Sequence, residues 1–209
     1  MIKYILAALI LGVFLGYLNA NWVTVINSLW VSDDLLNVSL VLLLFVMGAA
    51  FTIDTESISK MRRVGPKILF VPSVIVLGTL LGGVLSGFIL GINVVASTAV
   101  SAGFGWYTMT GPMITQVFGA KWGALAFASN FLRELITIVT VPLMVRVDKY
   151  APIASGGATS MDTTLSVIVK YCGRESLITA FSSGFVLSLL APFMILAVAS
   201  LGGIRFAFF

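Results

Sequence analysis

The chain of 209 residues is 59% hydrophobic and only 10% charged, with a mean hydropathy of +1.11. This composition lies far outside that of soluble domains and predicts an all-α polytopic membrane protein. The net charge of +4 comes from Lys and Arg near the ends of apolar segments, so it gives no support to nucleic-acid binding. One cysteine and no histidine exclude an internal disulfide, a zinc site and histidine catalysis, and we expect no cofactor.

Apolar windows of about twenty residues predict a single transmembrane domain over residues 1–209. Its seven expected membrane segments are residues 4–18, 35–53, 66–90, 94–118, 122–147, 156–172 and 176–201. The first resembles a secretory signal peptide, but the further spans after it favour a retained helix. The third carries glycines at small-xxx-small spacing, which predicts close packing of another helix: Gly78, Gly82, Gly83, Gly87 and Gly91.

Orientation is predicted from the loop at residues 54–67, which holds four basic residues, whereas the loop at residues 19–34 has two acids and no base. The first loop and the N-terminus are therefore predicted to be cytoplasmic. If every later segment spans the membrane, Lys121 and Lys170 are cytoplasmic, and Arg146 and Lys149 are outside. A re-entrant fourth or sixth segment would invert the orientation of the later segments.

Two of the expected segments are interrupted, near residues 103–112 and 155–164. Glycines, a proline and hydroxyl residues replace the apolar pattern, and bare backbone at membrane depth needs protein or a water-filled cavity around it. Asp162 is predicted to cap the short helix after the second break. Two broken helices are a feature of secondary transporters. Alternatively, the glycines only permit packing, and Asp162 is an ordinary N-cap in a solvated loop.

The fifth segment places Asn130, Arg133 and Glu134 in an apolar span. Arg133 lies about 16 Å along the helix from Trp122, close to the middle of a ~30 Å hydrocarbon core. Charges there cost roughly 2.5–3.5 kcal/mol each, so they must pair or face water. Adjacent residues point about 100° apart, so Arg133 and Glu134 are expected to engage different partners. Buried pairs that only join helices are the alternative.

Trp106 and Tyr107 lie at the first break, where an aromatic face would hold an ammonium group, unless both only fill space there. The candidate substrate-binding residues from both breaks and the fifth segment are Asp162, Glu134, Arg133, Asn130, Tyr107, Trp106, Thr108, Ser160 and Thr163. Carboxylates of Asp162 and Glu134 would hold ammonium groups. A half-helix N-terminus and Arg133 would receive a carboxylate.

Four motifs resemble the LysO-type lysine exporter family of bacteria and archaea, over about residues 40–192. They are Ser101-Ala-Gly-Phe-Gly-Trp-Tyr107 with Gly111, Asn130-x-x-Arg-Glu134, Gly156-Gly-Ala-Thr-Ser-Met-Asp-Thr163 and Gly184-Phe-x-Leu-Ser-Leu-Leu190. The resemblance implies export of L-lysine and its analogue thialysine across the cytoplasmic membrane, in exchange for protons or another ion such as sodium. It also implies that intramembrane acids are essential, with Asp162 first and Glu134 next.

Members of that family carry about three additional N-terminal spans, so this chain is similar to the C-terminal portion of a split version. A second copy, or a small membrane subunit, is expected to supply the missing spans. Some relatives have an acid where this chain has Phe131 and a histidine where it has Ser183, which leaves substrate and coupling ion open.

Two other functions stay open. One is a sodium-coupled transporter of another amino acid or a carboxylate, with Arg133 as the main ligand. The other is an intramembrane enzyme or a scaffold subunit, but the sequence has no HExxH motif and no pair of aspartates on separate spans that would support catalysis.

Overall fold

The computed structural model describes residues 69–203 continuously and scattered positions before residue 60. Two compact units divide the chain, residues 1–47 and 48–209, and the continuously described residues all belong to the second unit. The expected segments 4–18 and 35–53, the basic loop 54–67 and Pro66 fall outside the continuously described part.

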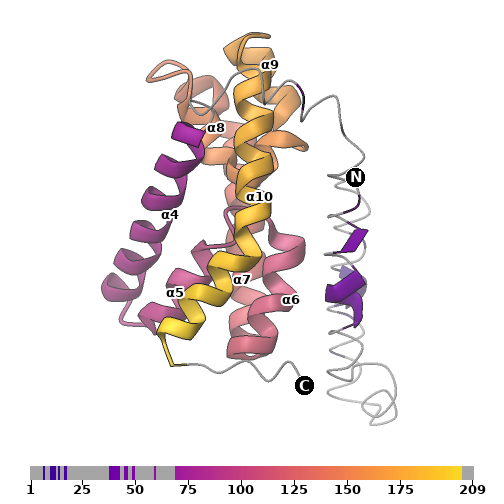
Figure 1. The fold of residues 1–209 in the computed structure, drawn as a ribbon, viewed down its shortest axis with the longest axis vertical. Helices are drawn as coiled ribbons and strands as arrows, with labels where there is room; N and C mark the ends of the chain where they lie inside the picture. Colours follow the sequence, from indigo (N-terminus) through magenta and orange to yellow (C-terminus); the bar gives the residue numbers. More distant parts are fainter. Residues whose placement is uncertain are drawn as a thin grey trace. The chain divides into compact units, whose positions relative to one another are not determined.

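The second unit is built of helices, shown in Figure 1. They are α4 (Phe70–Ile89), α5 (Val94–Ser101), α6 (Tyr107–Phe118), α7 (Ala120–Met144), α8 (Ala151–Gly156), the 3-10 helix η3 (Gly157–Met161), α9 (Leu165–Cys172) and α10 (Ser176–Leu201). Among the described residues, α4, α7 and α10 are long and apolar enough to cross a membrane. The expected third, fifth and seventh segments correspond to these three helices.

The expected fourth segment is a helical hairpin. Its first helix, α5, packs against α4, its second helix, α6, packs against α7, and the two run in opposite directions. α5 packs antiparallel on α4: a Cβ at Gly87 would lie 2.8 Å from Cα of Val94, and one at Gly83 would lie 2.9 Å from Cα of Thr98. The backbone then breaks over residues 102–106, where Phe104 has a positive φ of 51°.

After the break, α6 runs antiparallel to α7, to which Gly119 joins it at a φ of +89°. The Tyr107 ring packs edge-on against Phe131, with centroids 5.3 Å apart. One turn further along α6, a Cβ at Gly111 would lie 3.2 Å from Cβ of Phe127. The chain therefore returns to the end of the unit from which α5 entered.

The prediction of close packing along the third segment holds for only part of the glycines. Gly83 and Gly87 face α5 at contact distance, but a Cβ at Gly78 or Gly82 would meet nothing within 4 Å. The physical reason is that the adjacent Gly82 and Gly83 point about 100° apart, so Gly78 and Gly82 lie on a different face of α4 from Gly83 and Gly87. The prediction is confirmed for Gly83 and Gly87, and within the described residues no helix packs against Gly78, Gly82 or Gly91.

The expected sixth segment is a second hairpin, made of α8, η3 and α9. Ile153 of α8 and Ile168 of α9 pack together with Ala180 of α10 in one buried cluster. A Cβ at Gly184 of α10 would overlap with the backbone of η3, at 2.5 Å from the nitrogen of Met161. In Figure 1 the two hairpins lie at opposite ends of α7 and α10.

The tips of the two hairpins meet beside the middle of α7. The backbone N–H of Ala158 donates to the carbonyl oxygen of Phe104 at 2.8 Å. A Cβ at Gly105 would lie 3.1 Å from the carbonyl oxygen of Gly156, and one at Gly157, whose φ is +61°, would clash with the Phe104 carbonyl. Both helix breaks therefore form one packed crossing, and glycine permits the close approach.

Candidate functional site

Asn130 holds the first break in place. Its side-chain oxygen accepts from the backbone N–H of Gly105 at 2.7 Å, and its amide group donates to the carbonyl oxygens of Val100 and Ala126. The residue is buried, and its side-chain oxygen gives the N–H of Gly105 in the break an acceptor. In this conformation Asn130 supports the site through the backbone.

Arg133 holds the second hairpin. Its Nε donates to the carbonyl oxygen of Ser155 at 2.8 Å, and its Nη2 donates to that of Ala154 at 2.9 Å. These carbonyls lie at the C-terminal end of α8, where they lack helical partners and a cation is favourable. Thr137, one turn along α7, adds a hydroxyl contact to Ser155 at 2.6 Å.

Glu134 is the most unusual group of the site. Its side chain is 1% exposed, and neither carboxyl oxygen has a hydrogen-bond partner among the described residues. As expected from the helical geometry, it engages different surroundings from Arg133. A buried carboxyl group without a partner is costly, and such groups mark sites where a proton, cation or ligand is exchanged.

Three groups from both hairpins surround this carboxyl. The hydroxyls of Tyr107 and Thr163 lie beside it, although neither makes a hydrogen bond of acceptable geometry with it. The carboxyl group of Asp162 is close enough to interact electrostatically with both Glu134 and Tyr107. We refer to Tyr107, Glu134, Asp162 and Thr163 as the acidic cluster.

The prediction that Asp162 caps the following helix was wrong. α9 begins after Thr164, and no side chain caps it. Instead, Oδ1 of Asp162 accepts from the backbone N–H of Thr163 at 2.6 Å, and the side chain is exposed at the hairpin tip. The reason is that η3 ends in a turn before α9 starts, which leaves Asp162 two residues too early to cap it.

The other candidates separate into two groups. Ser160 is buried and its hydroxyl bonds to the carbonyls of Gly157 and Ala180, so it ties η3 to α10. Trp106 is half-buried at the N-terminal end of α6, and Thr108 is exposed in its first turn.

Sequence reasoning missed two buried hydroxyl groups on α10. The side-chain oxygens of Ser182 and Ser183 have no hydrogen-bond partner among the described residues. Serine in an apolar helix ordinarily bonds to its own backbone, so the sequence offers no signal for this.

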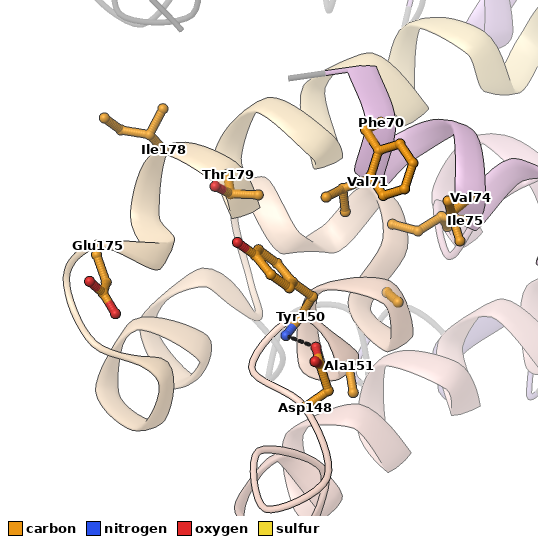
Figure 2. A pocket seen from close by; sticks show the side chains of 11 residues that line it. Phe70, Val71, Val74, Ile75, Asp148, Tyr150, Ala151, Glu175, Ile178 and Thr179 are labelled. Atoms are coloured by element: carbon orange, nitrogen blue, oxygen red, sulfur yellow. Dashed lines mark hydrogen bonds between the residues drawn. The ribbon is translucent and has the colours of Figure 1, made fainter. Parts of the chain in front are cut away.

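Two cavities lie along α4, at its opposite ends. The larger, of about 730 Å³, lies between the start of α4, the start of α8 and the start of α10. Figure 2 shows the apolar side chains of α4 on one side of it, facing Tyr150 and the carboxylates of Asp148 and Glu175. The smaller, of about 290 Å³, lies between α4, α5 and α7 and includes Asn130 and Arg133 in its wall.

Comparison with known proteins decides the family. The family model described as lysine exporter LysO matches residues 6–199. The chain belongs to the lysine exporter LysO family. Its relatives are named as exporters, which agrees with the expectation of a transporter rather than an enzyme.

Two curated relatives differ in length. The chain is 30% identical over 198 residues to a Haemophilus influenzae protein named "Putative lysine exporter", a match that covers 94% of this chain and 97% of the relative. It is 35% identical over 159 residues to the lysine exporter LysO of Escherichia coli, which covers 75% of this chain but 52% of that protein. The chain thus spans about half the length of the Escherichia coli relative. No solved structure matches the chain significantly.

Proposed function

We propose that the chain is a secondary transporter that exports L-lysine, and analogues such as thialysine, across the cytoplasmic membrane of a prokaryote in exchange for a cation. The observation that carries this proposal is the buried, unpartnered carboxyl group of Glu134 at the crossing of two helical hairpins. Membership of the LysO family supports lysine as the cargo.

The two hairpins are proposed to enter the membrane from opposite sides. α4 would lead outward from the basic loop 54–67, the α5–α6 hairpin would return to the outside, and α7 would lead back to the cytoplasm. The α8–α9 hairpin would then enter from the cytoplasm, and α10 would lead outward. This path puts four flanking basic residues on the cytoplasmic side: Arg146, Lys149, Lys170 and Arg174. Lys121 would lie outside. Full spans would instead place both Arg146 and Lys149 outside, so the positive-inside rule favours the path with two re-entrant hairpins.

The acidic cluster is proposed to hold an ammonium group of lysine. The carboxylates of Glu134 and Asp162 attract the cation, and the hydroxyl oxygens of Tyr107 and Thr163 add acceptors beside it. In the first turn of α6 the N–H of Tyr107 donates to the carbonyl of Gly105, so the N–H groups of Thr108 and Met109 would receive the substrate's carboxylate. A proton that arrives from outside would compete for the same carboxylates, and that competition would couple the two fluxes.

Arg133 is proposed as a second ligand for the substrate's carboxylate. In the described conformation two of its N–H groups are bonded to α8. Binding through these groups would require a state in which the α8–α9 hairpin has moved away from α7. Arg133 would then link substrate binding to hairpin movement.

A partner is proposed to complete the site. Asp162 is exposed at the hairpin tip, which the proposed topology places at membrane depth, where a charged side chain facing lipid is strongly unfavourable. Either a second copy or a small membrane subunit would cover it. The additional length of the Escherichia coli relative supports this expectation.

Resistance to thialysine in a sensitive host tests the function. The host would express this chain alone, or with a candidate three-span partner, and the native chain would be compared with Asp162→Asn. Resistance that requires Asp162 supports lysine export. Correctly inserted protein that gives no resistance under either condition would instead favour a different cargo.

A further inference from the structure

The smaller cavity has a composition that the acidic cluster does not explain. It lies between α4, α5 and α7, Glu134 is not among its lining residues, and it reaches from Arg133 to Leu90 and Ile92 in the connection between α4 and α5. Five of its eleven lining residues carry a hydroxyl group: Thr79, Ser86, Ser97, Ser101 and Ser129.

Four of these hydroxyl groups donate their single proton to a backbone carbonyl. Ser97 donates to the carbonyl of Gly83 and Ser101 to that of Ser97, both at 2.8 Å. Ser86 donates to Gly82, and Ser129 donates to Ala126 at 3.3 Å. A hydroxyl whose proton is engaged offers only lone pairs to a neighbour. The wall therefore presents acceptors, which suit a cation such as an ammonium group.

The inner end of the cavity has the opposite character. Arg133 has five N–H donors, and two of them are bonded to α8. The other three have no hydrogen-bond acceptor among the described residues. Asn130, which also lines this end, has both its amide group and its oxygen engaged by backbone. A guanidinium with uncommitted donors is suited to a carboxylate.

From this polarity we infer that the smaller cavity is a second binding site, which takes the zwitterionic head group of an amino acid. The carboxylate binds Arg133, and the ammonium group binds the serine oxygens of α5 and α7. A volume of about 290 Å³ is at the lower end of the range for small-molecule sites and fits a single amino acid. The inference rests on the proposed function and extends it from one site to two.

The position of this second site assigns it to the outer side of the membrane, where an exporter releases its substrate. In the proposed topology the α4–α5 connection faces outside, so the cavity is open outward and ends at the membrane's middle. The bond between Nη2 of Arg133 and the carbonyl of Ala154 closes its inner end. Ala154 also lines the larger cavity at the other end of α4, so this bond joins a residue of one cavity wall to a residue of the other.

Thiol labelling in intact cells tests the inference. Cys172 is first replaced by serine, and Ser129→Cys then places a thiol in the cavity wall. Ala120→Cys, at the exposed outer end of α7 and outside the cavity, is the matched control. A membrane-impermeant maleimide is added outside, with and without L-lysine. Cadaverine, which lacks the carboxylate, and L-norleucine, which lacks the side-chain ammonium, are added in parallel.

We expect external lysine and norleucine to slow labelling at Ser129→Cys and not at Ala120→Cys. Cadaverine should protect at least about tenfold less potently, because it cannot bind Arg133. Equal protection by cadaverine, or no protection by lysine in cells that still show thialysine resistance, overturns the second site while the proposed function stands. Absent resistance with lysine protection intact contradicts export and supports the amino-acid site.

Two leucine substitutions, one inside the cavity and one outside it, provide a second and independent test. Ser129→Leu places bulk in the cavity, whereas Ala128→Leu adds the same bulk at an exposed neighbour outside its wall. Ser129→Leu should reduce thialysine resistance at least about tenfold with normal membrane insertion, and Ala128→Leu should leave it unchanged. Equal resistance in both variants would contradict the inference.

Discussion

The backbone N–H of Ala158 lies 2.8 Å from the carbonyl oxygen of Phe104, and this bond joins the tips of two hairpins that enter the unit from opposite ends. Both tips contribute to the acidic cluster: Tyr107 follows the first break, and Asp162 and Thr163 follow the second. Glu134 of α7 lies between them. Any movement of one hairpin relative to the other therefore changes the surroundings of that carboxyl group.

Asn130→Ala should destabilise the crossing, because it leaves the buried N–H of Gly105 without its acceptor. At ~1–3 kcal/mol for an unpaired buried group, the melting temperature should fall by about 5 °C. Thermal unfolding of purified protein in detergent measures the change. Ser129→Ala, at the exposed neighbouring position, should shift it little. Equal effects in the two variants would argue against this role of Asn130.

Gly157→Ala should be more damaging than the same substitution in α4. The added methyl group at Gly157 meets the Phe104 carbonyl and lies 2.9 Å from Nη2 of Arg133, on a backbone with φ of +61°. At Gly82 the methyl meets nothing within 4 Å, and alanine favours the helix. The melting temperature should fall by several degrees for Gly157→Ala and stay level or rise for Gly82→Ala. A tolerated Gly157→Ala would show that the hairpin tips are not tightly packed.

Glu134→Gln should separate transport from stability. The carboxyl group has no hydrogen bond to lose, and glutamine has nearly the same volume, so the melting temperature should not fall. Lysine export should fall at least about tenfold, because an amide neither carries charge nor exchanges a proton. Glu175→Gln is the control, since its side chain is 78% exposed and 4.0 Å from Lys149. Full export by Glu134→Gln would remove this residue from the mechanism.

Thiol accessibility at two ends of α7 should decide the membrane path. In a Cys172→Ser background, Ala120→Cys should react with an impermeant maleimide from outside, and Val147→Cys only after the membrane is opened. Both positions are exposed, and neither substitution changes the charge balance. Full spans throughout would give the reverse pattern, which would contradict the two re-entrant hairpins.

The sequence predicted both breaks, but the first is shorter than expected: the backbone breaks at residues 102–106, and Gly111 and Pro112 lie inside α6. It left open whether the fourth segment spans the membrane or doubles back, since a kinked helix and a hairpin can share the same local composition. The direction after the break is set by contacts far along the chain, such as those of Gly111 with α7.

The cost of buried charge also identified Arg133 and Glu134, but it did not reveal what each one contacts. The bonds of Arg133 to Ala154 and Ser155 depend on how the second hairpin folds back, 21 and 22 residues later. The unpartnered state of Glu134 is likewise a property of the assembled crossing. The residue types indicate that each buried charge needs a partner. Only the tertiary structure shows which partner it has, or that it has none among the described residues.

Transport of labelled L-lysine into inverted membrane vesicles tests the central claim most directly, with any required partner subunit present. The acidic cluster predicts that Asp162→Asn lowers the initial rate at least about tenfold relative to the native chain. Asp148→Asn, a carboxylate outside the cluster, should keep the rate. An unchanged rate for Asp162→Asn, at equal protein in the membrane, would contradict the claim that lysine export depends on acids at the hairpin tips.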